Sequence, residues 1–152
     1  MAVDLDDWDR AILRVLLDDG GLGAKAVAAA VGMSQPAVWR RMRALETAGV
    51  IAGRRVTVDR AARGYGVTVV LGVKLAGRGR AGPAEFERAV LAIPEVQLVQ
   101  HVLGVYDYRL RVVARDIADF ERVLRRRIMT LPGVGEIESN VVLSERERPP
   151  PL

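Results

Sequence analysis

Residues 24–49 read AKAVAAAVGMSQPAVWRRMRALETAG, and this stretch decides the fold of the first third of the chain. It opens with small apolar residues that predict a short helix, and Gly32 is a typical residue to end it. Ser34 is a good N-cap and Pro36 suits a first helical turn, so a second helix is expected to run to about Ala48. Two short helices joined by so tight a turn predict a helix-turn-helix motif.

The sequence on either side of this stretch completes a small domain. Asp6 is a suitable N-cap for an earlier helix, whose apolar residues recur at helical spacing: Trp8, Ala11, Ile12, Val15 and Leu16. After the motif, two extended segments, Val50–Ala52 and Arg55–Val58, flank a turn at Gly53-Arg54 and predict a hairpin. We therefore expect a winged helix-turn-helix domain over residues 1–59.

From Val67 onward the hydrophobic pattern changes to a period of two, which is typical of strands. Apolar runs and breakers predict the order strand, helix, strand, strand, helix, strand: 67–75, 83–93, 96–103, 107–114, 116–129 and 137–143, with a glycine-rich loop at 77–82. This order predicts a ferredoxin-like βαββαβ domain over residues 67–145. A linker at 60–66 and a disordered tail at 146–152 complete an α+β chain.

The composition excludes several classes of function. The 152 residues include no cysteine and one histidine, which excludes disulfides, thiolate metal sites and multi-histidine metal sites. There is no glycine-rich phosphate motif, catalytic triad or paired-carboxylate motif, so we expect neither an enzyme nor a cofactor. No apolar run approaches a membrane span and no signal peptide is visible, so a cytoplasmic location is expected.

Positive charge is concentrated around the helix-turn-helix. The net charge of the chain is +4, but residues 34–66 alone carry seven basic and two acidic side chains, a balance of +5. A polyanion such as double-stranded DNA is the expected partner of such a segment, although an ordinary solvated arginine face has the same composition.

The second helix of the motif is expected to enter the major groove of DNA. Gln35 can pair with adenine and Arg40 with guanine through two hydrogen bonds each. Trp39 can pack on a thymine methyl group or a sugar, or it can belong to the core. Phosphate contacts are expected from Arg43, Arg54 and Arg55 and from Arg41. Arg41 can alternatively bond within the domain because it neighbours the inward face. Ser34 at the helix start is included among the DNA-binding residues.

The segment Gly104-Val105-Tyr106-Asp107-Tyr108 is the second candidate site. A carboxylate beside a glycine turn can hold the ammonium group of an amino acid, whose carboxylate would bind turn N–H groups. The alternative is an ordinary hairpin whose aspartate caps the turn. The nearby His101 and the basic run Arg125–Arg127 are interpreted as structural or solvated, with a salt bridge between subunits as a second interpretation of the run.

Motifs in both halves of the chain resemble those of the Lrp/AsnC regulators, the leucine- and asparagine-responsive proteins of bacteria and archaea. The resemblance extends from about Leu5 to Leu143 and is carried by these residues: Leu5-Asp6, Asp9-Arg10, Ile12-Leu13, Val27-Ala28, Val31–Ser34, Val38, Arg41-Met42, Leu45-Glu46, Gly49–Ile51, Gly104–Tyr108, Leu131–Val134 and Ser139–Leu143. The sequence departs from the family at Gly23, which replaces a polar cap, and at the bulky Trp39.

The resemblance implies a transcriptional regulator whose C-terminal domain dimerises and often assembles into octamers. It also implies an amino-acid effector bound between subunits near Gly104, Tyr106, Asp107 and Tyr108, and we include Ser139 of the last strand in this set. Two rival hypotheses are an architectural DNA-binding protein without an effector and, more remotely, a decarboxylase-like enzyme on the same scaffold. Such decarboxylases resemble the family in fold but rely on histidines. This chain has one histidine, which counts against this hypothesis.

Overall fold

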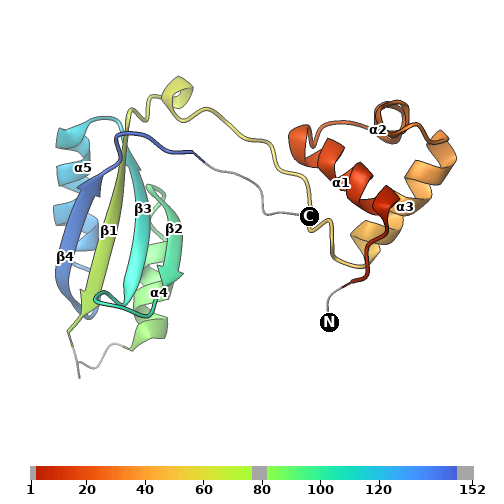
Figure 1. The fold of residues 1–152 in the computed structure, drawn as a ribbon. Coiled ribbons are helices and arrows are strands. Elements are labelled where there is room, and N and C mark those ends of the chain that lie inside the picture. The colour runs from red at the N-terminus through yellow and green to blue at the C-terminus, as the bar shows by residue number, and fades with distance from the viewer. Residues whose placement is uncertain (1–2, 77–81, 147–152) are drawn as a thin grey trace. The chain divides into compact units, whose positions relative to one another are not determined.

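The structure is a computed structural model that describes residues 3–76 and 82–146 (Figure 1). The described chain divides into two compact units, one ending at Thr57 and the other spanning Val58–Arg146. Most of the glycine-rich loop expected at 77–82 and the tail residues from 147 onward lie outside the described residues. Each unit has a hydrophobic core of its own.

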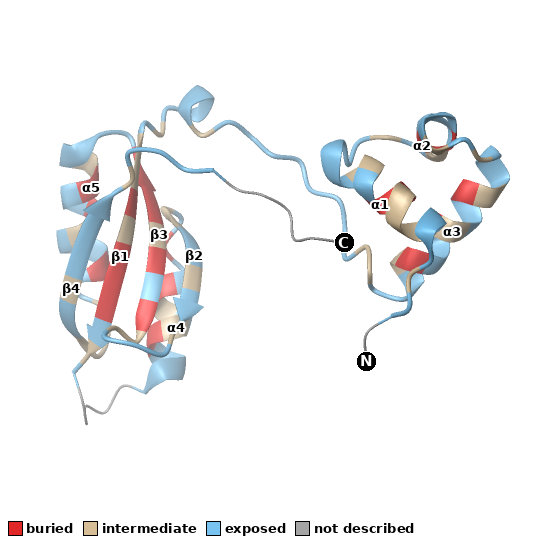
Figure 2. Ribbon diagram, in the orientation of Figure 1, coloured by how far each residue is buried: buried red, intermediate tan, exposed pale blue. Residues whose placement is uncertain are grey.

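The N-terminal unit consists of three helices, α1 (Asp7–Asp18), α2 (Ala24–Val31) and α3 (Gln35–Thr47). Their buried residues lie where the helices face one another (Figure 2). They form a single cluster: Ile12, Leu13, Val27, Ala28, Val38, Met42 and Leu45. The predicted helix-turn-helix is therefore confirmed, and the predicted inward face of α3 is the buried one.

Local signals place the helix ends as expected. Asp6 caps α1 by accepting a hydrogen bond from the backbone N–H of Asp9, whose side chain bonds back to the N–H of Asp6. Gly32 ends α2 at a φ of 73°, a left-handed conformation that favours glycine. Trp8 differs from its prediction, because the buried face of α1 is centred on Ile12 and Leu13 and Trp8 is half exposed.

The paired strands of the predicted wing are not formed. Residues 52–59 run without strand pairing, although the sequence alternates in the manner of a hairpin. The N–H groups of Val50 and Ile51 both donate to the carbonyl of Leu45 and so terminate α3. Donors used at a helix end are not available for a ladder, and an isolated two-stranded hairpin is marginally stable.

The C-terminal unit is a four-stranded antiparallel sheet with helices on one face (Figure 1). Its elements are β1 (Val67–Leu75), α4 (Pro83–Leu91), β2 (Val96–His101), β3 (Tyr108–Ala114), α5 (Ile117–Val123), η2 (Leu124–Ile128) and β4 (Val134–Val141). The strand order β2-β3-β1-β4 confirms the ferredoxin-like prediction. Apolar side chains of β1 and β3 pack against α4 and α5, and the opposite face of the sheet carries no helix among the residues that the structure describes.

Details of this unit differ from the predicted boundaries. The second strand ends at His101 rather than at Leu103, and Leu143 lies beyond β4, fully exposed. The last helix changes into a π-helical turn at η2. In the predicted linker, a short turn, η1 (Ala61–Arg63), follows Arg60, which bonds to Thr68 and Glu145 of the same unit.

Candidate nucleic-acid interface and ligand segment

The exposed face of α3 lies opposite the face that packs on the core. Val38, Met42 and Leu45 hold the helix on the core, so Gln35, Trp39, Arg40 and Arg43 remain exposed. Trp39 is 56% exposed, which excludes the interpretation that it belongs to the core. The Arg43 guanidinium lies 5.9 Å from the centre of the Trp39 ring, at cation–π range, and 3.2 Å from Glu46.

The start of α3 has an unused capping group. Ser34 occupies the N-cap position with an extended backbone, but its hydroxyl makes no capping hydrogen bond. Pro36 occupies the first turn, where a missing N–H does no harm. Ser34 and Gln35 are both exposed, so the first turn presents a hydroxyl and an amide to solvent.

Arg41 forms its bonds within the N-terminal unit. Its Nη1 donates to Oδ2 of Asp6 at 2.7 Å and to Oδ1 of Asp9 at 2.8 Å. These carboxylates hold the pKa of Arg41 above its ordinary value. The sequence identified Arg41 as a neighbour of the inward face but not its acidic partners, although two carboxylates three residues apart share one face of α1.

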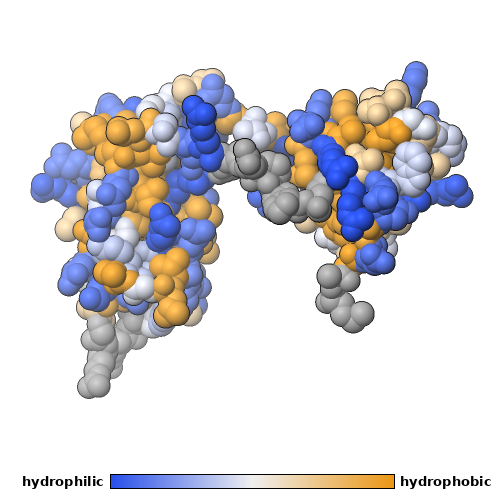
Figure 3. Space-filling model, viewed as in Figure 1, coloured by the Kyte–Doolittle hydropathy of each residue, from blue (hydrophilic) through white to orange (hydrophobic). Residues whose placement is uncertain are grey.

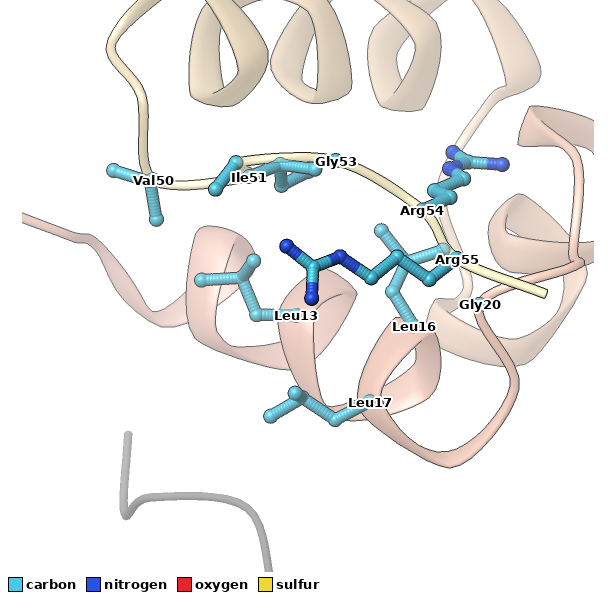
Figure 4. A pocket seen from close by; sticks show the side chains of 10 residues that line it. Leu13, Leu16, Leu17, Gly20, Val50, Ile51, Gly53, Arg54 and Arg55 are labelled. Carbon is cyan, nitrogen blue, oxygen red and sulfur yellow. The ribbon is translucent and has the colours of Figure 1, made fainter. Parts of the chain in front are cut away.

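Arg54 and Arg55 follow α3 in the segment predicted as a wing. Nη1 of Arg54 donates to the carbonyl of Leu22 at 3.0 Å, which ties this segment to the loop before α2. Arg55 extends across an open groove of about 330 Å³ toward Leu13, whereas Arg54 points away from the groove (Figure 4). Other side chains of the groove are aliphatic, among them Leu17 and Ile51.

The predicted ligand segment forms the connection between β2 and β3. The N–H of Asp107 donates to the carbonyl of Val73 at 3.0 Å, and its Oδ2 accepts from the N–H of Leu75 at 2.8 Å. The carboxylate thus reaches across to β1, beside the register shift at Lys74/Leu75, instead of capping its own turn. Gly104 is exposed in the same connection.

The two tyrosines of the segment lie on opposite faces of the sheet. The Tyr106 ring covers Gly72 on the helix-free face, and its hydroxyl donates to Glu138. This bond raises the pKa of Tyr106 and lowers that of Glu138. Tyr108 is fully buried beneath α4, where its hydroxyl donates to Glu87 at 2.7 Å.

Tyr108 belongs to the core on the helical face. Its ring lies 4.7 Å from that of Phe86 and is stacked at 4.7 Å on that of His101. Burial raises the pKa of Tyr108 to about 12, with a contribution from the bond to Glu87. The sequence therefore grouped two tyrosines that the structure separates, and it missed Glu138, whose position opposite Gly72 is fixed only by strand register.

Ser139 lies on β4, away from the β2–β3 connection. It is paired with Leu71 of β1 and borders a groove of about 190 Å³. Apolar side chains supply most of that groove, including Leu124 of η2, Met129 directly after it and Ile137 of β4. Two arginines of the basic run pair within the unit, Arg125 with Glu121 and Arg127 with Glu95.

Space-filling representation shows hydrophobic and hydrophilic residues interspersed on the helix-free side of the sheet (Figure 3). In the described part of the chain, no group of three or more potential ligand side chains could hold a metal ion. Among the same residues, no helix combines the length and apolar character that a membrane span requires.

Comparisons with known proteins agree with both units. Residues 5–52 match the winged helix-turn-helix DNA-binding family, and residues 68–152 match the Lrp/AsnC ligand binding domain. The Bkd operon transcriptional regulator of Pseudomonas aeruginosa is 33% identical over 97% of this chain and 98% of its own length.

Two solved structures share the fold over nearly the whole chain. A transcriptional regulator of Neisseria meningitidis in complex with L-Met has a TM-score of 0.88 and 26% identity, covering 95% of this chain and 94% of its own. The feast or famine regulatory protein of M. tuberculosis complexed with L-methionine has a TM-score of 0.82 and 28% identity, covering 95% and 96%. The prediction of a regulator rather than an enzyme is confirmed, and the chain belongs to the Lrp/AsnC family of DNA-binding transcriptional regulators.

Proposed function

We propose that this regulator reads a specific site on double-stranded DNA with the exposed face of α3, and that an amino acid bound between subunits controls that binding. The observation that carries the DNA part is the exposure of Gln35, Trp39 and Arg40 on a helix whose opposite face is held in the core. Such an arrangement lets a helix enter the major groove while it keeps all its packing contacts with the core.

The proposal divides the exposed side chains by chemistry. Arg40 pairs with guanine and Gln35 with adenine, while Trp39 packs on a thymine methyl group or a sugar. Arg43, Arg54, Arg55 and the Ser34 hydroxyl contact phosphates and set the register. Arg43 would exchange its exposed ion pair with Glu46 for a phosphate, at little loss because exposed pairs contribute little stability.

The effector part of the proposal places an amino acid near the connection between β2 and β3. Asp107 would attract the ammonium group, and N–H groups around Gly104 would bind the carboxylate. Tyr106 would border the ligand from the helix-free face, where its ring already covers Gly72. Tyr108 would act indirectly, because its side chain is buried under α4, and Ser139 would contribute from a different edge of the sheet.

The helix-free face of the sheet also supports self-association. Val70, Leu98 and the Tyr106 ring lie on that face among charged side chains, and another subunit could cover it. We propose a homodimer of this kind, with further assembly up to an octamer, in the cytoplasm. Two subunits would place paired α3 helices on half-sites about 34 Å apart, or on multiples of that spacing.

The DNA test begins with a binding site selected by the protein from random duplexes, compared with a shuffled duplex of equal composition. Arg40→Ala should reduce the preference for the selected duplex by about 1–3 kcal/mol, the usual value of a paired guanine contact. Arg55→Ala should weaken binding to both duplexes equally. It should also reduce the salt slope, which is the slope of log affinity against log salt concentration, by about 0.9. If the wild-type protein binds both duplexes alike, it is an architectural protein and the proposal fails.

The effector test is a thermal-shift screen with the standard amino acids. A ligand at 100 times its dissociation constant stabilises by about 2.7 kcal/mol, which moves the melting temperature by several degrees. Asp107→Asn should abolish the shift, because an amide can still accept the N–H of Leu75 but offers no charge to an ammonium group. An unchanged shift in this variant would contradict the assigned role of Asp107.

A further inference from the structure

Arg41 joins the DNA-reading helix to the capped end of α1. A single nitrogen, Nη1, bonds to both Asp6 and Asp9, at 2.7 and 2.8 Å. The two carboxylates are themselves fixed, since they form the reciprocal cap of α1. The side chain of Asp9 is only 17% exposed, so this end of the interaction is partly shielded from solvent. The result is a polar clamp between one flank of α3 and a rigid helix end.

The clamp lies where it controls the roll of α3 about its axis. Successive residues of a helix are about 100° apart, so Arg41 stands between the buried Met42 and the exposed Arg40. As a whole helix, α3 lies against α2 more extensively than against α1. Apolar contacts are non-directional and tolerate a small rotation, whereas two short hydrogen bonds do not. Fixing the α1 side of the helix therefore fixes the direction in which Arg40 points.

We propose that Arg41 is a positioning residue that sets the orientation of α3 for base reading and does not itself bind a phosphate. This inference rests on the proposed function of α3. The local charge supports it, because a phosphate approaching Arg41 would meet two carboxylates bonded to it. A base contact needs correct geometry within a fraction of an ångström, so a small roll of the helix weakens specific binding more than general attraction to DNA.

The decisive variant changes the carboxylates and leaves every arginine in place. Asp6→Asn with Asp9→Asn removes both negative charges opposite Arg41, while Asn at position 6 still caps α1. Each carboxylate uses one oxygen for the cap and the other for Arg41, so an asparagine that keeps the cap turns its NH2 group toward Arg41 and cannot accept from it. The matched control is Asp4→Asn with Asp7→Asn, which removes the same charge from the same segment; no ion pair joins either residue to Arg41 in the described chain. Fluorescence anisotropy measures binding to the selected and the shuffled duplex over a range of salt concentrations, after circular dichroism has confirmed folding.

Both double variants should bind shuffled DNA somewhat more tightly, because two negative charges are gone. Only Asp6→Asn/Asp9→Asn should reduce the ratio of affinities for selected and shuffled duplexes, by about 5-fold or more, toward the loss expected for Arg40→Ala. Arg41→Ala should reduce the same ratio without changing the salt slope. If the clamp variant is too unstable, Arg41→Ala alone decides between the outcomes.

Two results would overturn the inference. If Arg41→Ala lost affinity equally for both duplexes, with the salt slope reduced by about 0.9, Arg41 would be a phosphate contact. An unchanged ratio in Asp6→Asn/Asp9→Asn would show that the clamp does not orient α3. Failure of the proposed function is distinguishable, because it is seen in the wild-type protein, which would then show no preference for the selected duplex.

Discussion

Gly72→Ala tests how the ligand segment is attached to the sheet. Gly72 lies on the helix-free face of β1, directly beneath the Tyr106 ring. A Cβ atom at this position would lie 2.6 Å from Cδ2 and 2.8 Å from Cγ of Tyr106. These atoms are near the base of the ring and cannot move without the whole side chain. The ring must therefore leave β1 and give up its bond to Glu138.

The expected loss of stability follows from two opposing effects. Inserting a methyl group into an occupied space destabilises by about 1–3 kcal/mol. Replacing glycine by alanine within a strand returns about 0.5–1 kcal/mol, because the unfolded chain loses freedom. A net destabilisation of about 1–2 kcal/mol should remain. It should lower the melting temperature of a unit of this size by roughly 4–8 °C per kcal/mol.

Urea unfolding of a double-mutant cycle with Tyr106→Ala measures this interaction. Far-UV circular dichroism follows both units, while tryptophan fluorescence, excited selectively, follows only the N-terminal unit, because Trp8 and Trp39 both lie there. Gly72→Ala should affect the dichroism transition alone. In the Tyr106→Ala background it should become neutral or stabilising. The same destabilisation in both backgrounds would refute the explanation.

Three further predictions concern the cores and the titrating groups. Ile12→Ala should destabilise the N-terminal unit by about 2–5 kcal/mol, seen as an earlier tryptophan transition in urea, because Ile12 is fully buried; a shift below 1 kcal/mol would contradict its place in the core. Tyr108 should ionise only near pH 12; because burial raises the pKa of the folded state, stability should fall as the pH rises from about 10 to about 12, and Tyr108→Phe should remove this dependence. In the folded state the N–H of Asp9 and, secondarily, Arg41 lower the pKa of Asp6. The stability that the Asp6 carboxylate contributes should therefore be complete above its ordinary pKa of about 3.9 and be lost as the pH falls through the lower pKa of the folded state. An acid-unfolding profile of Asp6→Asn identical to that of the wild-type protein would contradict this.

Much of the candidate site was predictable because it depends on short-range signals. The Ser34 and Pro36 start, the Gly32 stop and the apolar stripe of α3 act within a few residues of one another. They are sufficient to define which face of that helix is exposed, and therefore that Arg40 lies on the exposed face. The strand alternation from Val67 onward likewise identifies the buried face of β1.

Other residues were misplaced because their environment is made by distant segments. The paired strands predicted for the wing are not formed, and Val50 and Ile51 instead donate to the end of α3, which local alternation does not reveal. Tyr106 and Tyr108 are two residues apart and would share a face if both lay in one strand. The strand β3 begins only at Tyr108, so Tyr106 reaches the other face of the sheet. The role of Trp39 was open in the sequence, and packing alone settled its exposure.

The sequence by itself determined the order of elements, the two kinds of domain and the exposed basic face of α3, because hydrophobic period, caps and breakers are local properties. Only the tertiary structure decided which charged groups meet. Arg41 finds Asp6 and Asp9 more than thirty residues away, and Asp107 finds the backbone of β1 thirty-two residues away. Partners so far apart are selected by the packing of whole helices and by strand register, which no short stretch of sequence specifies.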